Sequence, residues 1–262
     1  MEFTLMSHLL SRPLAVAGSV ATSTLAGWRG CMVVKAAPQP EKPLVLYDME
    51  ACPHCRRVRE ALTALHLDAD IRPCPKGGQR FRPEAEALGG KQQFPLLQDQ
   101  NNGRVLYESE DIVHYLFTTY GQRPVPKAYR FRPHQPVLGS LGSAARGLRG
   151  LRADGSRAPQ KPLHLWSFEG SPYSRLVRER LCELEIPYRV HNLGKEHWNE
   201  AGPASRRLKP GPYQPIPGGK RDAFFRQHQR VQVPYLEDPN SGEALYESAD
   251  ILAYLERRYA MV

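Results

Sequence analysis

The residues of this chain best suited to covalent chemistry are two cysteines separated by a proline and a histidine, Cys52-Pro53-His54-Cys55. The nucleophilic form of cysteine is the thiolate, so a reactive site has to lower the pKa of a thiol. A cysteine at the start of a helix meets unpaired backbone N–H groups and the positive end of the helix dipole. Apolar residues recur with helical spacing after Cys55, and Arg56, Arg57 and Arg59 add positive charge. We therefore predict that Cys52 is the nucleophile and Cys55 the resolving thiol.

The same spacing also occurs in half of a zinc site, and an inert remnant is a third alternative. The chain has no second cysteine pair at zinc spacing, and Pro53 ahead of an amphipathic helix favours redox chemistry, so no metal is expected. Five cysteines in 262 residues are odd in number and sparse, which argues against a secreted disulfide framework. Of the other three, Cys74 is either a third redox thiol or a loop residue, Cys182 is expected to be partly packed, and Cys31 receives no role.

The chain repeats itself. Residues 42–62 match 161–181 at 11 of 21 positions, and residues 94–116 match 233–255 at 13 of 23. The offset grows from 119 to 139, which predicts an insertion of about 20 residues near 198–228, a Pro-, Gly- and Arg-rich stretch expected to be a loop. The second copy has Ser171-Pro172-Tyr173-Ser174 where the first has its cysteines, so it cannot carry out dithiol exchange.

Each copy shows the same order of expected elements. In the first copy, an apolar strand at 44–47 precedes the cysteines, a helix follows from Cys55, and a second strand lies near 70–72. A hairpin of 95–98 and 104–107 turns at Asn101-Asn102-Gly103, and a last helix opens at Ser109. In the second copy a strand at 188–192 and a helix opening at Ser248 correspond.

This order, with Cys-Pro-x-Cys after the first strand, an apolar residue and proline before the third, and Tyr-Glu-Ser before the last helix, resembles a glutaredoxin. It is equally similar to the N-terminal domain of a glutathione S-transferase. The resemblance covers roughly 42–120 and 161–260 and implies a thioredoxin fold.

The resemblance also implies a glutathione site. Phe94-Pro95 is similar to the family's cis-proline, whose backbone holds the cysteinyl part of glutathione, close to Pro53 and His54. Glu108 and Ser109 of Tyr107-Glu108-Ser109 resemble the site for the γ-glutamyl end, which places a carboxylate on a helix N-terminus. The second-copy equivalents are Ser171, Ser174, Val233, Pro234, Glu247 and Ser248.

We therefore expect an α/β protein with two tandem thioredoxin-like domains, each a mixed four-stranded sheet with flanking helices. The predicted boundaries are 1–41 for an N-terminal helical or targeting segment, 42–120 for the redox domain, 121–160 for a basic linker with a short helix, and 161–262 for the redox-silent domain. Gly18-Ser19 to Gly30 echoes Gly139-Ser140 to Gly150, which favours a repeated element over a targeting segment. No helical C-terminal domain of the transferase type is expected, because the two copies fill the chain.

The net charge of +9 is concentrated in residues 121–160, which hold eight basic residues and one acid. No groove-reading helix or aromatic sheet motif accompanies this charge, so a nucleic-acid partner is not expected. The uncharged run 13–28 is too short to span a bilayer, and we expect a cytoplasmic protein, with an organelle-targeted one as the alternative.

The first functional hypothesis is a glutathione-linked thiol–disulfide oxidoreductase that uses Cys52 and Cys55, with glutathione as cosubstrate and a thiol or disulfide protein as a further partner. The alternatives are a non-catalytic module that binds glutathione or a protein, and a glutathione transferase or isomerase. In a transferase-like reaction of the second copy, Ser171 or Tyr173 would hold the thiol of glutathione.

Overall fold

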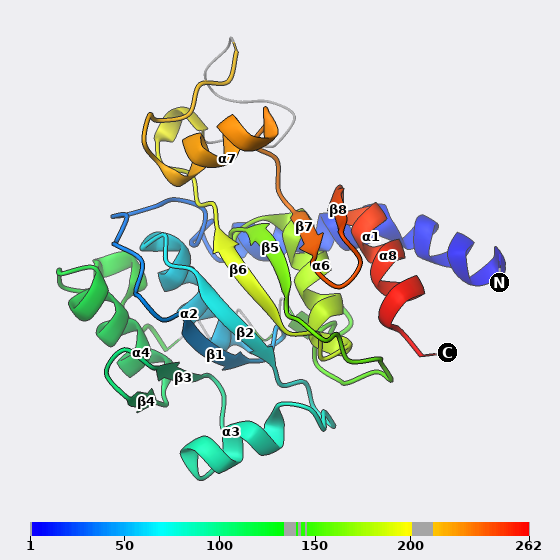
Figure 1. Ribbon diagram of the computed structural model, residues 1–262, viewed down its shortest axis with the longest axis horizontal. Helices are drawn as coiled ribbons and strands as arrows, with labels where there is room; N and C mark the ends of the chain where they lie inside the picture. The colour runs from blue at the N-terminus through cyan, green and yellow to red at the C-terminus, as the bar shows by residue number, and fades with distance from the viewer. Residues whose placement is uncertain (1, 134–139, 141–142, 145, 201–211, 262) are drawn as a thin grey trace.

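Short strands, most of which alternate apolar with polar residues, form one mixed sheet of eight strands in the order β4-β3-β1-β2-β6-β5-β7-β8 (Figure 1). The computed structural model describes residues 2–133, 140, 143–144, 146–200 and 212–261, with side chains from residue 13 onward. The predicted α/β class is confirmed. The sheet is shared, however: the strands of residues 42–120 (the first half) and of 161–262 (the second half) join edge to edge, where two separate sheets had been expected.

The two halves have matching elements. The first half contains β1 (Leu44–Asp48), α2 (Pro53–Ala64), β2 (Ala69–Pro73), α3 (Arg82–Gly89), β3 (Leu96–Asp99), β4 (Arg104–Leu106), α4 (Ser109–Tyr115) and the π-helical turn η1 (Leu116–Tyr120). The second half contains β5 (Leu163–Ser167), α6 (Pro172–Glu183), β6 (Tyr188–Asn192), the short 3-10 turn η3 (Trp198–Glu200), α7 (Lys220–His228), β7 (Tyr235–Asp238), β8 (Glu243–Tyr246) and α8 (Ser248–Tyr259). Helix α1 (Glu2–Leu25) precedes the first half, and the 3-10 turn η2 (Lys127–Tyr129) follows it.

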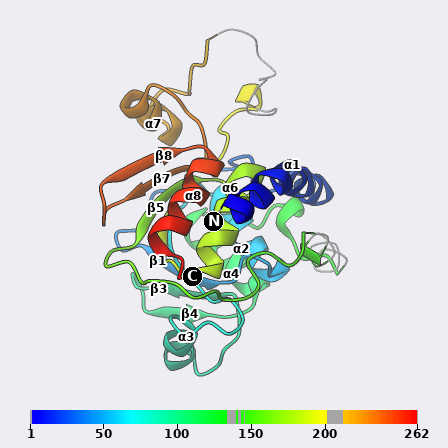
Figure 2. The same ribbon diagram turned by 90° about the vertical axis from the view of Figure 1, so that its right-hand side faces the viewer.

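The alternation of side chains along the strands sets the layers. In β1, Leu44 and Leu46 face the large core beneath α2, α4, α6 and α8, whereas Val45 and Tyr47 face α3 on the opposite side. In β5 the same alternation turns Trp166 toward α7. Figure 1 shows α3 and α7 at opposite ends of the molecule, and Figure 2 shows α1 and α6 near one another on one side of the sheet. The sequence missed both α3 and α7, and the loop expected over 198–228 is wrong for Lys220–His228.

The halves join at the antiparallel pair of β2 and β6. Asp70 stands opposite Arg189 in the register, and the guanidinium donates to both carboxylate oxygens at 2.7 and 3.0 Å. The two residues occupy equivalent repeat positions at the offset of 119, so the junction lies on a local twofold relation between the halves. A bidentate pair of this kind fixes the strand register as well as supplying energy.

The segments that precede the two halves show the same twofold relation. The segment before the first half contacts the second half, and the segment before the second half contacts the first. The Ser23 hydroxyl donates to the carbonyl of Gly170 at 3.1 Å, and the Ser143 hydroxyl donates to the carbonyl of Ala51 at 3.0 Å. Gly30 (φ 73°) and Gly150 (φ 74°) end the two segments in the left-handed region. A Cβ on Gly30 would lie 2.8 Å from the Cβ of Glu169, so this close crossing requires glycine. The echo noticed in the sequence is therefore a structural repeat.

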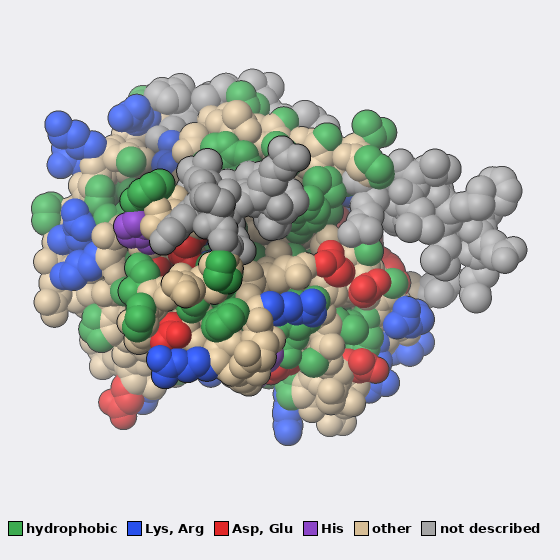
Figure 3. Space-filling view, turned by 90° about the horizontal axis from the view of Figure 1, so that it is seen from above, with side chains coloured by type: hydrophobic (Ala, Val, Ile, Leu, Met, Phe, Trp, Pro, Cys, Tyr) green, Lys and Arg blue, Asp and Glu red, His purple; other side chains and the backbone are tan. Residues whose placement is uncertain are grey.

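The described part of the expected linker packs on both halves, and on the second half the Arg157 N–H donates to the carbonyl of Tyr259 at 2.8 Å. Lys76 pairs with Arg152 in an isolated parallel bridge, and the Lys76 N–H donates to the carbonyl of Leu151 at 2.6 Å. On the face seen in Figure 3, Lys and Arg side chains are scattered among Asp and Glu side chains and form no continuous basic surface there. Within the described residues, no helix is long and apolar enough to cross a membrane.

Candidate functional site

Cys52 is the N-cap residue of α2, with the extended backbone that this position requires (φ −78°, ψ 122°). Its sulfur accepts a hydrogen bond from the backbone N–H of Cys55 at 3.4 Å. The pKa of Cys52 is lowered to about 7, mainly by the hydrogen bond from the Cys55 thiol and also by the backbone N–H groups of Cys55 and His54. A substantial fraction of Cys52 is therefore thiolate at neutral pH.

Cys55 is fully buried in the first turn of α2. Burial raises its pKa well above the usual value, and the neighbouring Cys52 thiolate raises it further. The motif thus contains one half-buried sulfur that ionises easily and one buried sulfur that keeps its proton. His54, between them, is exposed, and Pro53 is the first residue of the helix.

The arginines that follow the motif contribute less positive charge to Cys52 than the sequence suggested. Arg56 pairs with Glu60 at 3.0 Å, and Arg57 donates to the hydroxyl of Ser109 at 3.0 Å. Arg59 is buried among carboxylates, and its effect on the pKa of Cys52 is smaller than that of the hydrogen bonds. Local hydrogen bonding at the helix start is therefore the main cause of the low pKa.

The other three cysteines are buried. Burial raises the pKa of Cys31 to about 11 and raises the pKa values of Cys74 and Cys182 as well. Cys74 packs in the core beneath α3, so the structure favours the loop-residue alternative over a third redox thiol. Cys182 was expected to be partly packed. It lies fully between the halves, where its sulfur accepts from the Glu50 N–H at 3.5 Å and its thiol donates to the Gly150 carbonyl at 3.3 Å.

The serine pair of the second half keeps the backbone geometry of the cysteine pair. Ser171 is the N-cap of α6 (φ −69°, ψ 117°), and its hydroxyl accepts from the N–H of Ser174 at 3.3 Å. Helix α1 covers this site, because the Ser19 hydroxyl donates to the Pro172 carbonyl at 3.0 Å. Ser171 is only 2 % exposed, whereas Tyr173 is 39 % exposed.

Both proline bonds singled out in the sequence, Phe94–Pro95 and Val233–Pro234, are cis. In the sheet, Leu96 stands opposite Tyr47 and Tyr235 opposite Trp166. Each proline therefore lies beside the C-terminal end of β1 or β5, and the chain continues from that end to Cys52 or Ser171.

The Tyr-Glu-Ser segments start α4 and α8. Glu108 (φ 61°) and Glu247 (φ 62°) adopt a left-handed backbone and precede the first helical residues, Ser109 and Ser248. Glu108 accepts a hydrogen bond from the side chain of Gln93, and Glu247 accepts one from Gln232. The proline loop and the Tyr-Glu-Ser loop are thus tied together in each half, and Arg57 ties Ser109 to α2 in the first half.

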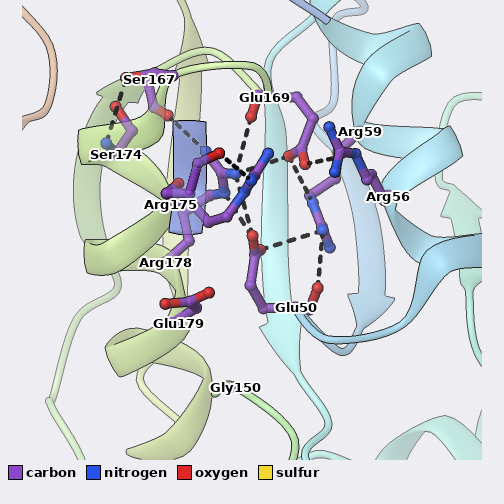
Figure 4. A network of polar contacts seen from close by, with 12 residues as sticks. Glu50, Arg56, Arg59, Gly150, Ser167, Glu169, Ser174, Arg175, Arg178 and Glu179 are labelled. Atoms are coloured by element: carbon purple, nitrogen blue, oxygen red, sulfur yellow. Dashed lines mark hydrogen bonds and ion pairs between the residues drawn. The ribbon is translucent and has the colours of Figure 1, made fainter. Parts of the chain in front are cut away.

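Sequence reasoning missed a buried ionic network at the centre of the molecule (Figure 4). Arg59 contacts Glu169 at 2.9 Å and Glu50 at 3.3 Å, and Arg178 contacts the same two carboxylates at 2.9 and 3.1 Å. None of these four side chains is more than 6% exposed. A signal was available, because both the glutamate and the arginine are identical in the two copies at the offset of 119.

A narrow cleft of about 20 Å³, with room for little more than one water molecule, lies between Cys52 and this network. The described residues that line it come from the first half, the second half, α1 and the linker: Thr22, Glu50, Ala51, Cys52, Pro53, Arg56, Arg59, Ser143, Arg146, Arg149, Glu169, Arg175 and Glu179. In the described part of the chain, no cluster of His, Cys, Asp and Glu is arranged to hold a metal ion.

Comparison with known proteins finds one matching family. The model of the glutathione S-transferase N-terminal domain matches residues 46–124 and 165–261, which together make up more than half of the chain. No curated protein matches the chain.

Among solved structures, a Nilaparvata lugens delta-class glutathione transferase is 33% identical over 30% of this chain and 36% of its own, with a TM-score of 0.27. Bombyx mori BmGSTD1, solved as a complex with GTT, is 27% identical over 32% of this chain and 38% of its own, with a TM-score of 0.29. The Leishmania trimeric glutathione transferase TDR1 is 12% identical over 84% of this chain and 68% of its own, with a TM-score of 0.27. This chain therefore spans little more than a third of the length of the two insect enzymes.

Proposed function

Since this chain belongs to the family of the glutathione S-transferase N-terminal domain, we propose that it is a glutathione-linked thiol–disulfide oxidoreductase whose chemistry is carried by Cys52 and Cys55. The single observation that supports this most is the pairing of an ionisable Cys52, with a pKa of about 7, and a buried, protonated Cys55 that donates to it. A transferase needs only one group to hold the thiol of glutathione, whereas a second thiol beside the first is useful for resolving a mixed disulfide.

The reaction begins when the Cys52 thiolate attacks one sulfur of a glutathione mixed disulfide. A new bond forms between Cys52 and the glutathionyl sulfur, the original S–S bond breaks, and the departing thiolate takes up a proton. Either the Cys55 thiol gives up its proton and attacks Cys52, which releases glutathione and leaves a Cys52–Cys55 disulfide, or a second glutathione thiol attacks the glutathionyl sulfur. On the first route two further glutathione molecules reduce the Cys52–Cys55 disulfide by two successive exchanges. Glutathione thus supplies the two electrons on both routes, and glutathione disulfide is the final oxidised product.

Glutathione lies, in this proposal, along the loops beside Cys52. The backbone at Phe94–Pro95 pairs with its cysteinyl part, and Glu108 with Ser109 receives the γ-glutamyl end. The hydrogen bond between Gln93 and Glu108 supports this assignment, because it holds the two loops next to one another. A small mixed disulfide or an exposed protein disulfide would be the substrate, in the reducing setting of the cytoplasm.

The test is an assay that couples reduction of a glutathione mixed disulfide to glutathione reductase. The Cys52→Ser variant should lose at least about a thousandfold in rate, since a serine hydroxyl ionises far too weakly to replace a thiolate. The matched control is Ser171→Ala, which changes the equivalent residue of the second half and should keep the wild-type rate. Full activity of Cys52→Ser, or no activity of the wild-type protein, would overturn the proposal.

A second candidate is favoured by the geometry of the second half, which keeps its cis-proline, its left-handed Glu247 and its Gln232 contact without any thiol at Ser171. In this alternative the second half binds glutathione or a protein segment and does not turn it over. Calorimetric titration with glutathione distinguishes this alternative from the oxidoreductase. Binding that the Cys52→Ser variant keeps and the Cys52→Ser/Glu247→Ala double variant loses would support a retained binding module.

A further inference from the structure

Helix α1 has its polar side turned toward the protein and its apolar side turned away. Ser19 and Ser23 are fully buried, and their hydroxyls donate to carbonyls at and just before the start of α6. Leu14, Val20 and Leu25 are 76%, 38% and 59% exposed. A surface helix of a globular protein normally has the reverse arrangement, with its apolar side against the core. The contacts of α1 with α6 therefore leave its apolar side facing solvent.

The exposed apolar residues of α1 form one continuous stripe. Leu14, Ala17, Ala21 and Leu25 are all exposed and recur at intervals of three or four residues, which places them on one side of the helix. They extend over about 16 Å of helix, and residues 13–28 contain no charged side chain. Single exposed apolar residues are normal on a protein surface, whereas an uncharged stripe of this length is typical of a contact surface.

A second segment lies against the residues that connect α1 to β1. Residues 121–133 follow the first half and contain no acid. The side chain of Lys35 donates to the carbonyl of Gly121 at 2.9 Å, and the backbone of Gly30 hydrogen-bonds to the hydroxyl of Tyr129. These two contacts hold the segment beside the connection, so the two stretches of chain share one part of the surface.

The two adjacent stretches combine cations with exposed apolar side chains. Residues 3–40, like the second segment, contain no acid. Glu60, which pairs with Arg29 at 3.0 Å, has a side chain that is only 3% exposed. The exposed residues include cationic ones and apolar ones: Lys35, Lys127, Arg130 and Arg132, and Trp28, Val34 and Phe131. A cationic surface of this kind is complementary to an anionic partner.

We propose that this face, formed by the outer side of α1 and the segments 28–35 and 121–133, docks on an anionic lipid surface. The helix lies in the plane of the membrane interface, with Leu14 and Leu25 in the acyl boundary and the cations at the lipid headgroups. Docking in this way leaves the contacts between α1 and α6 intact, and it is independent of the chemistry at Cys52.

Two other occupants fit the face less well. A nucleic acid would use the cations and the aromatic rings, but the aliphatic stripe of α1 offers it nothing to stack on. A second copy of the chain would cover the stripe, but each copy has a net charge of +9, so the two cationic faces would repel one another. An anionic lipid surface is complementary to both the stripe and the cations.

The test is co-sedimentation of the full chain with vesicles of phosphatidylcholine alone and of phosphatidylcholine mixed equally with phosphatidylserine. The protein should bind the anionic vesicles at least about tenfold more tightly than the neutral ones, and high salt should weaken that preference. The Leu14→Gln/Leu25→Gln variant should bind the anionic vesicles at least about tenfold more weakly, because it loses apolar burial. The Arg130→Gln/Arg132→Gln variant should bind them about thirtyfold more weakly, at about fivefold for each cation.

Matched controls lie at or beside α7, on the side of the sheet opposite α6. Trp198→Gln/Ile216→Gln replaces two exposed apolar side chains, and Arg226→Gln/Arg230→Gln replaces two exposed cations. Both control variants should keep the wild-type affinity for the anionic vesicles. All the substituted side chains are exposed, so circular dichroism should show an unchanged fold in every variant.

Weaker binding by the leucine and arginine variants, with both controls unchanged, would support the proposal. Equal affinity for neutral and anionic vesicles, no binding to either, or binding that the leucine variant keeps would overturn it. A dimer in sedimentation velocity that the leucine variant loses, without vesicle binding, would assign the face to a second copy and contradict the proposal. Binding of single-stranded RNA without vesicle binding would assign the face to a nucleic acid and contradict it as well.

Discussion

Helix α2 of the first half and helix α6 of the second half begin with almost the same backbone geometry, but the N-cap residue is a cysteine in α2 and a serine in α6. Cys52 and Ser171 share an extended N-cap backbone and accept hydrogen bonds from the residue three positions on at 3.4 and 3.3 Å. Cys52 is half-buried, whereas Ser171 lies under α1 at 2 % exposure. The backbone that lowers a thiol pKa therefore persists where there is no thiol, which shows that the scaffold and the chemistry are separable.

The second half contributes charged side chains to the first half across the junction between them. Glu169 and Arg178 complete the buried network with Glu50 and Arg59, and Arg175 lines the cleft at Cys52. The comparison between the halves is thus one between a reactive site and a structural partner, and substitutions at equivalent positions can test it.

The largest expected effect is on stability, at the two equivalent arginines of the network. Arg59→Met removes the arginine that pairs with Asp48 and one of the two that pair with Glu50 and Glu169. Arg178→Met removes the other of those two and a donor to Ser167. Each should lower the free energy of unfolding by about 3–5 kcal/mol, with the larger loss at Arg59. Urea unfolding followed by circular dichroism measures both.

Arg180→Met is the control for this comparison. Its partners Asp154 and Glu256 have side chains that are 54% and 44% exposed, so its loss should cost about 1 kcal/mol or less. Equal costs at Arg59, Arg178 and Arg180 would show that the central network has no special structural role.

Access to the helix start is the second point to test. In a Ser171→Cys variant, the introduced thiol and Cys52 stand on equivalent backbones in one molecule, but α1 covers the introduced one. Its alkylation should be at least about tenfold slower than that of Cys52, because it requires α1 to move away first. Labelling with iodoacetamide and peptide mass spectrometry gives both rates. Equal rates would mean that α1 does not restrict access and that the halves differ in reactivity only because the second lacks these cysteines.

The starts of the last helices provide a smaller contrast. Ser109 accepts from the buried Arg57, but the second half has Leu176 in place of that arginine, and the hydroxyl of Ser248 has no partner among the described residues. Ser109→Ala should cost about 1–3 kcal/mol in unfolding free energy, and Ser248→Ala less than about 0.5 kcal/mol. A cost at Ser248 as large as that at Ser109 would contradict the contact pattern.

The pH dependence of alkylation sharpens the reactive side of the comparison. The folded-state pKa of Cys52 is depressed to about 7, so its thiolate dominates above pH 7 and its alkylation rate should fall about tenfold for each pH unit below it. In Cys55→Ala the main cause of the depression is removed, and the midpoint should move up toward the ordinary thiol value. A midpoint unchanged by this substitution would show that the Cys55 thiol is not the cause.

Much of the local structure could be predicted from the sequence, because its signals are local. The run Leu44–Tyr47, the Cys-Pro start of α2 and the Asn-Asn-Gly turn each reflect a preference of a few neighbouring residues, and they lie where expected. The cis bond at Phe94–Pro95 followed from the resemblance. Helix α7 was missed because its sequence is mostly polar and follows two glycines. Long-range contacts hold it, among them the packing of Phe224 against Tyr235 and Trp166 and the ion pair of Arg221 with Glu200 at 2.9 Å.

The long-range features could not be predicted in this way. A charged residue in the middle of an edge strand usually prevents pairing, and Asp70 and Arg189 each suggest an edge when considered separately. Only the register that places them opposite one another turns two edges into a junction. The cleft at Cys52 was missed for a similar reason, since its arginines come from residues as distant as Arg56, Arg146 and Arg175.

The measurement that tests the central claim most directly is capture of the mixed disulfide. The Cys55→Ser protein, which lacks the resolving thiol, is incubated with glutathione disulfide at pH 7 and analysed by intact-protein and peptide mass spectrometry. The account predicts a single glutathionyl group, attached to Cys52 and removed by excess glutathione. No adduct, or adducts formed equally on Cys31, Cys74 or Cys182, would contradict the assignment of the chemistry to the first half.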